Sequence, residues 1–82
     1  MMTLGKLAIA ARMMECRDTM KHLYGDRWPA VSEPYRTLIS GAMEATGDKN
    51  PLSAVIPICK DMQAKGQNHV LLMAVAVDMA DS

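Results

Sequence analysis

Three glycines, Gly25, Gly47 and Gly66, divide this 82-residue chain into four stretches, and the first three stretches carry apolar residues at helical spacing. Glycine commonly follows the last residue of a helix because it adopts a left-handed backbone at little cost. Residues that recur at i, i+3, i+4 and i+7 lie on one side of a helix. The pattern predicts an all-α fold: a small bundle of about four helices joined by short turns, in a single domain over residues 1–82.

The first predicted helix runs from Leu4 to about Tyr24, with Thr3 as its N-cap, and it has two apolar sides. One side consists of Ile9, Met13, Cys16, Met20 and Leu23. The opposite side is apolar only in the first half of the helix, where it consists of Leu4, Leu7, Ala8, Ala11 and Met14. A helix that is apolar all round must be covered on both sides, and the domain's own core covers one of them. We therefore expect a second copy of the chain to cover the other, with these self-association candidates: Leu4, Leu7, Ala11 and Met14.

The composition favours the same expectation. Half of the residues are hydrophobic, which is more than the core of so small a domain can cover. The chain is methionine-rich, with nine Met and no Phe, and Met both fills irregular gaps in cores and suits adaptable binding surfaces. The formal net charge is zero, so the chain has no global electrostatic attraction to nucleic acid or anionic lipid.

The second predicted helix follows a connector over residues 26–31 that contains Trp28 and Pro29. Ser32 is the predicted N-cap, with Pro34 in the first turn, and Gly47 ends the helix. Its apolar stripe fits the helical period completely and consists of Tyr35, Leu38, Ile39, Ala42 and Met43.

The third predicted helix contains Pro57, which allows two interpretations. If Asn50 is the N-cap and Pro51 the first helical residue, Pro57 removes one backbone hydrogen bond and kinks the helix. If Ser53 is the N-cap, the helix starts late and Pro57 lies in its first turn at little cost. We favour the early start with a kink. The apolar stripe consists of Leu52, Val55, Ile56, Cys59 and Met62.

The last segment, from His69 to about Ala80, follows the capping residues Gln67 and Asn68. Residues 70–77 read VLLMAVAV, and periodicity alone does not separate helix from strand in such a run. We predict a helix buried on most sides, because no second β-like run exists to pair with a strand. Asp78 and Asp81 place negative charge at its C-terminal end, which the helix dipole disfavours. This end therefore either frays or meets a cation from elsewhere.

No motif in the sequence is typical of an enzyme. His22 and His69 have no second ligand or catalytic partner at a suitable spacing, and nucleophile triads, HExxH, CxxC and glycine-rich phosphate loops do not occur. Met13, Cys16 and Met20 could bind a soft metal, but their spacing favours core packing. The sequence predicts a protein without catalytic activity, cofactor or metal.

The two cysteines, Cys16 and Cys59, lie at apolar helical positions, where a free thiol behaves as a small hydrophobe. They are too few and too far apart for a disulfide framework, so we expect reduced thiols and a cytoplasmic protein. The longest uncharged apolar run, residues 70–77, is too short to span a membrane.

The aromatic residues gather in one stretch together with two arginines. Such a group can stack a base and neutralise a phosphate, or it can form a protein-binding hot spot. The alternative, which we favour, is that Trp28 covers the core and the tyrosines pack with their hydroxyls in water. The partner- or ligand-binding candidates in this stretch are Tyr24, Arg27, Trp28, Tyr35 and Arg36.

The function that these observations predict best is a small non-catalytic protein-interaction module. It would act as a homo-oligomer that binds or occludes an unidentified protein, as an inhibitor, adaptor or phage-type accessory protein does. One alternative is a small DNA-binding regulator, but the first turn of the third helix, residues 51–54, offers few groups that could read bases. The other alternative is a nucleotide-binding sponge or sensor that uses residues 24–36.

Overall fold

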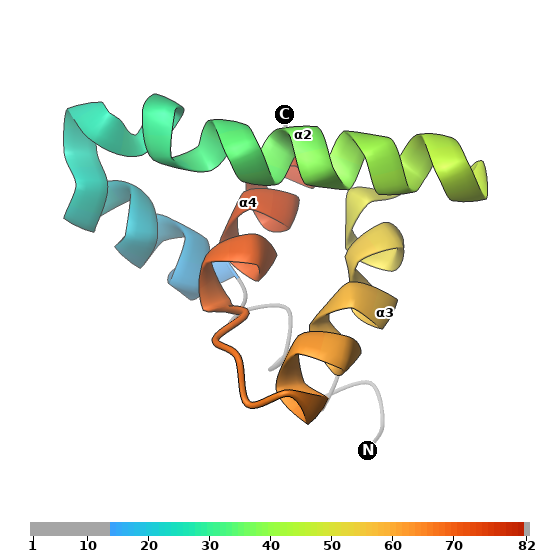
Figure 1. Cartoon of the computed structure of the whole chain (residues 1–82). Coiled ribbons are helices and arrows are strands. Elements are labelled where there is room, and N and C mark those ends of the chain that lie inside the picture. The colour runs from blue at the N-terminus through green and yellow to red at the C-terminus, as the bar shows by residue number, and fades with distance from the viewer. Residues whose placement is uncertain (1–13, 82) are drawn as a thin grey trace, which may run out of the picture.

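The computed structural model describes residues 14–81 of the chain. This part contains helices and turns but no strand, which confirms the prediction of a small all-α fold. Residues 14–24 are helical and lead into a short 3₁₀ helix, η1 (Gly25–Arg27). Three α-helices follow: α2 (Trp28–Thr46), α3 (Pro51–Ala64) and α4 (Val70–Asp81). In Figure 1, α2 runs along one side of the molecule, and α4 lies between residues 14–24 and α3.

Helix α4 is the centre of the core and packs against both α2 and α3. Its five buried residues are consecutive or nearly so, which means that most sides of the helix are covered: Leu72, Ala74, Val75, Ala76 and Val77. The prediction of a helix buried on most sides is therefore confirmed. The other helices complete the core with Trp28, Ile39, Val55 and Cys59.

Local capping determines where α3 and α4 begin. The side-chain oxygen of Asn50 accepts a hydrogen bond from the backbone N–H of Leu52 at 3.0 Å. Asn68 makes the same contact with Val70 at 2.9 Å, and α4 begins at Val70, one residue after the predicted start. Gly47, directly after α2, has a φ of +74°, the left-handed conformation expected after a helix end. The predicted turns at these positions are confirmed.

The predicted start of α2 is wrong. The helix begins at Trp28, and Ser32 lies inside it, fully buried, with its hydroxyl donating to the carbonyl of Pro29 at 3.3 Å. Pro29 is compatible with the first turn of a helix because the backbone N–H that it lacks has no intrahelical partner there. The Trp-Pro pair therefore starts the helix and does not form the predicted connector.

Two prolines lie inside helices, on the solvent side. Helix α3 begins at Pro51, so the early start is correct and the late start after Ser53 is wrong. Pro57 in α3 and Pro34 in α2 are both exposed. A proline removes the hydrogen bond to the carbonyl four residues earlier, and on an exposed side water can bond to that carbonyl. The helices therefore continue through both prolines.

Three residues assigned to apolar stripes are not in the core. Leu23 is 65% exposed, and Leu38 and Ile56 are each 49% exposed. Each lies at the edge of its stripe, and a fold with so few helices covers only the centre of each stripe. In residues 14–24 the contacts to the core come from Cys16, Met20 and Tyr24, which are spaced four residues apart. The surplus of apolar residues thus remains on the surface of the described part.

Truncation of two isoleucines separates core from surface. Ile39→Ala removes a fully buried side chain, and we expect a loss of about 2–5 kcal/mol in the free energy of unfolding. Ile56→Ala, on a half-exposed position, is the matched control and is expected to cost less than about 1 kcal/mol. Urea denaturation followed by circular dichroism measures both. Equal losses for the two variants would contradict this core.

Candidate functional site

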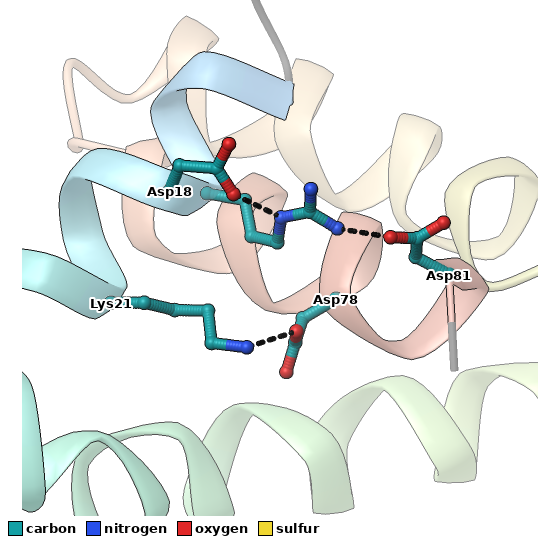
Figure 2. Close-up of a pocket in the computed structure, with 5 residues that line it drawn as sticks. Asp18, Lys21, Asp78 and Asp81 are labelled. Atoms are coloured by element: carbon teal, nitrogen blue, oxygen red, sulfur yellow. Dashed lines mark hydrogen bonds and ion pairs between the residues drawn. The ribbon is translucent and has the colours of Figure 1, made fainter.

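Cations from another part of the chain meet the acidic C-terminal end of α4. Arg17 donates from Nη1 to Oδ2 of Asp81 at 2.6 Å and from Nε to Oδ1 of its neighbour Asp18 at 2.9 Å. Lys21 donates from Nζ to Oδ1 of Asp78 at 3.1 Å (Figure 2). The sequence predicted that this helix end either frays or meets a cation, and in the structure it meets cations.

Asp78 also receives two groups from α2. Nε1 of Trp28 donates to its Oδ2 at 3.4 Å, and Nη2 of Arg36 lies 3.5 Å from the same oxygen. Only 18% of the Asp78 side chain is exposed. One carboxylate therefore connects residues 14–24, the start of α2 and the middle of α2 to α4. We call the whole group the ion-pair cluster: Arg17, Asp18, Lys21, Arg36, Asp78 and Asp81.

Arg17 is the cation that lies deepest in the ion-pair cluster, with 11% of its side chain exposed. Its hydrogen bonds to Asp81 and then to Asp18 raise the pKa of the guanidinium further above its ordinary value, against the opposing effect of burial. The side chain therefore keeps its charge at every pH at which the protein is folded. Both carboxylates that it contacts are on the solvent side, with 67% of Asp18 and 59% of Asp81 exposed.

An open pocket of about 490 Å³ lies within the cluster, lined by Arg17, Asp18, Lys21, Asp78 and Asp81. The cluster contains three cations and three carboxylates, so it has no net charge that would attract a charged ligand. Each of its carboxylates already accepts a bond from a basic side chain. Residues 14–81 contain no group of three or more His, Cys, Asp or Glu side chains that could hold a metal ion. The arrangement is suited to joining helices, because its ion pairs connect residues 14–24 and α2 to α4.

The aromatic candidates from the sequence lie mostly in the core. Trp28 is only 5% exposed. The centroid of the Tyr24 ring lies 6.5 Å from that of the Trp28 ring, and the two ring planes are inclined by 37°. Tyr35 is half-buried against the core. Arg27 is exposed, and Arg36, also exposed, pairs with Asp78. The structure thus gathers these side chains around the core boundary, and the indole of Trp28 presents no open face on which a base could stack.

The surface considered for DNA binding is also largely internal. In the first turn of α3, Pro51 and Ala54 are buried and Leu52 is half-buried. These side chains cannot enter a groove of DNA without leaving the core.

His22 is exposed and His69 half-buried, and each lies outside the ion-pair cluster.

Sequence reasoning identified the need for a cation at the end of α4 but none of its donors. The signal was the pair of acids, Asp78 and Asp81, where the helix dipole is unfavourable. The donors could not be identified because Arg17 is separated from Asp81 by 64 residues.

Comparisons with protein-family models, with curated proteins and with solved structures find no match to this chain. In the described part of the chain, no helix combines the length and the apolar character needed to cross a membrane. The function is therefore inferred from the geometry of the molecule itself.

The two thiols differ in their surroundings. Both are free; Cys16 is half-buried on the core side of residues 14–24, and Cys59 is buried in α3 at 8% exposure. Burial raises the pKa of the Cys59 thiol, because desolvation disfavours the thiolate. Since the thiolate is the reactive form and reagents reach a buried sulfur slowly, both effects lower the reactivity of Cys59.

Alkylation rates test this difference. With iodoacetamide at neutral pH, we expect the native protein to be modified at Cys16 first and at Cys59 only slowly, because Cys59 is buried and burial raises the pKa of its thiol. Peptide mass spectrometry over a time course measures both rates. In denaturant the two rates should become similar, which serves as the control. Modification of Cys59 at the rate of Cys16 in the native protein would contradict the packing of α3.

Replacement of the central carboxylate tests the ion-pair cluster. Asp78→Asn keeps the size of the side chain but removes the charge that Lys21 and Arg36 contact. We expect a loss of about 1–3 kcal/mol in the free energy of unfolding. The control, Asp61→Asn, breaks the exposed pair of Asp61 with Lys65 within α3 and should change stability by no more than about 0.5 kcal/mol. If both variants have the stability of the wild type, Asp78 does not join the helices as described.

Proposed function

We propose that this chain is a non-catalytic protein-interaction module of the cytoplasm that works as a homo-oligomer. A second copy would cover an exposed apolar face of α2. The observation that carries the proposal is the exposure of large apolar side chains on residues 14–24 and on α2, α3 and α4. They are Met14, Leu23, Leu38, Ile56 and Val70, each at least 37% exposed.

One such surface lies on α2, and we call it the outer face of α2. It consists of Pro34, Leu38, Gly41 and Ala45, which are spaced by four, three and four residues and are all exposed. Spacing of this kind places them on one side of the helix. Nothing lies within 4 Å of the position that a Cβ on Gly41 would occupy, so the middle of the face is open. The face combines apolar character with a small central residue that allows another backbone to approach closely.

A second copy fits this face better than a charged partner does. The four residues of the face carry no charge, and the chain as a whole has a formal net charge of zero, so two copies do not repel each other at long range. A 19-residue helix is about 28 Å long, which gives one helix face well below the roughly 800 Å² per partner of a stable interface. The dimer formed by this face alone is therefore weak and depends on concentration.

Met14 supports self-association at a second place. It is 45% exposed and lies on the side of its helix away from Cys16 and Met20, as expected for a helix with two apolar sides. The other self-association candidates, Leu4, Leu7 and Ala11, lie outside the described residues, and their role stays a prediction.

A charge on the outer face of α2 tests the proposal. Leu38→Lys places an ammonium group in the middle of the face, and we expect it to weaken self-association at least about tenfold, because the charge must be desolvated on contact. The control, Ser40→Lys, adds the same charge at an exposed position that lies about 100° or more around α2 from each residue of the face. Sedimentation velocity over a range of concentrations measures both. A wild-type protein that remains monomeric at every concentration would refute self-association through this face.

A further inference from the structure

Within the connection between residues 14–24 and α2, Gly25 is the only residue with a positive φ. Tyr24 has φ −84° and ψ −24°, Arg27 has φ −84° and ψ −8°, and Trp28 has φ −53° and ψ −45°. Gly25 alone is left-handed, with a φ of +55°. A change in the backbone of Gly25 to the right-handed region would therefore join residues 14–24 and α2 into one longer helix.

Capping side chains do not oppose this change. Neither Tyr24 before η1 nor Arg27 before α2 makes a side-chain capping hydrogen bond. In contrast, Asn50 and Asn68 cap the starts of α3 and α4. The boundary at Gly25 is thus held by tertiary contacts and by one backbone hydrogen bond, from the N–H of Trp28 to the carbonyl of Gly25, and lacks the side-chain caps that hold the other two.

The core-facing residues on the two sides of Gly25 are spaced by three or four residues: Cys16, Met20, Tyr24, Trp28, Ser32, Tyr35 and Ile39. Each step of four residues turns the position by about 40° around a helix, so on one continuous helix Cys16 and Ser32 would lie about 160° apart. The joined helix would therefore present the core-facing residues of the two segments on different sides.

The contacts that hold residues 14–24 on the rest of the protein can be made equally well by a second copy. They are the ion pairs of Arg17 with Asp81 and of Lys21 with Asp78, together with three partly buried side chains, Cys16, Met20 and Tyr24. All of these partners belong to residues beyond the Gly25 boundary, in α2 and α4 or elsewhere in the core.

We propose that residues 14–24 exchange between two copies of this chain, with Gly25 as the hinge. In the exchanged dimer, Arg17 and Lys21 of each chain bind Asp81 and Asp78 of the other, and the ion-pair cluster forms from two chains. Pro29 lies four residues after Gly25, so the extended helix lacks one hydrogen bond and is kinked there. The closed monomer is accordingly favoured at low concentration. This mode of assembly does not involve the outer face of α2 and is independent of it.

Substitution of the hinge glycine tests the proposal. Gly25→Ala strains the left-handed hinge and favours the helical one, because alanine disfavours positive φ and is the best helix former. We expect a gain of about tenfold per hinge, and thus about a hundredfold in the dimer association constant. The control is Gly47→Ala, which has a φ of +74° and equally open surroundings. Asn50, between Gly47 and α3, is extended at φ −105° and ψ 115°, so one rotation cannot join α2 to α3, and the oligomeric state should not change.

A charge-reversal mixture distinguishes exchange from any other dimer. Arg17→Asp and Asp81→Arg each break the pair of these residues within one chain. In an exchanged heterodimer of the two variants, both pairs are restored, one of them with reversed sign. We expect the mixture, after unfolding and refolding together, to form a heterodimer with a higher Tm than either variant alone. The control mixture is Asp61→Lys with Lys65→Asp, whose pair lies entirely within α3 and cannot be restored by exchange.

Each result decides the proposal. Exchange is supported if Gly25→Ala forms a dimer and the charge-reversal mixture shows rescue, that is, a heterodimer with a higher Tm than either variant alone. A dimer without rescue overturns exchange while leaving the outer face of α2 as the contact, and Leu38→Lys in the Gly25→Ala background then dissociates it. A Gly25→Ala variant that is folded by circular dichroism but monomeric overturns exchange as well. If Gly25→Ala does not fold, the mixture in the Gly25 background gives the answer, and absence of rescue there overturns exchange.

Discussion

Asp78 places a negative charge at the C-terminal end of α4, where the helix dipole already gathers partial negative charge, and only 18% of its side chain is exposed. Such a group is stable only if cations and donors surround it. Lys21, Arg36 and Trp28 supply them from residues 14–24 and from two positions of α2. The helices therefore take positions that bring these side chains to one carboxylate. Since α4 is also the most buried helix, the same contact orients the rest of the core around it.

The helices are not joined equally firmly. Helices α2, α3 and α4 share fully buried side chains such as Ile39, Val55 and Val75. Residues 14–24 contribute only partly buried apolar side chains and the ion-pair cluster. Ion pairs with solvent access contribute less to stability than buried apolar area, and salt weakens them. We therefore expect residues 14–24 to separate from the rest at a lower free energy than α2, α3 or α4, before the core itself opens.

The sequence predicted the features that local chemistry determines. Gly47, Asn50 and Asn68 act within one turn of the backbone, and their roles are visible without knowledge of the fold. Ser32 was misassigned because the same residue suits a helix start or a buried position where its hydroxyl bonds to the preceding turn. Leu38 and Ile56 fit the helical period as well as their buried neighbours do, and only the number of packed helices decides which positions are covered. The acids at the end of α4 indicated a missing cation, yet the donor Arg17 comes from the opposite end of the chain.

The ion-pair cluster bears directly on how two copies can associate. An exchange of residues 14–24 preserves every bond of the cluster and every apolar contact of Cys16, Met20 and Tyr24, because identical surfaces meet in both arrangements. The difference in free energy between two monomers and one exchanged dimer therefore reduces to the hinge at Gly25, the kink at Pro29 and the entropy lost on association. The interior contacts, however strong, cancel from this difference. Gly25 thus has more influence on the oligomeric state than any residue of the core.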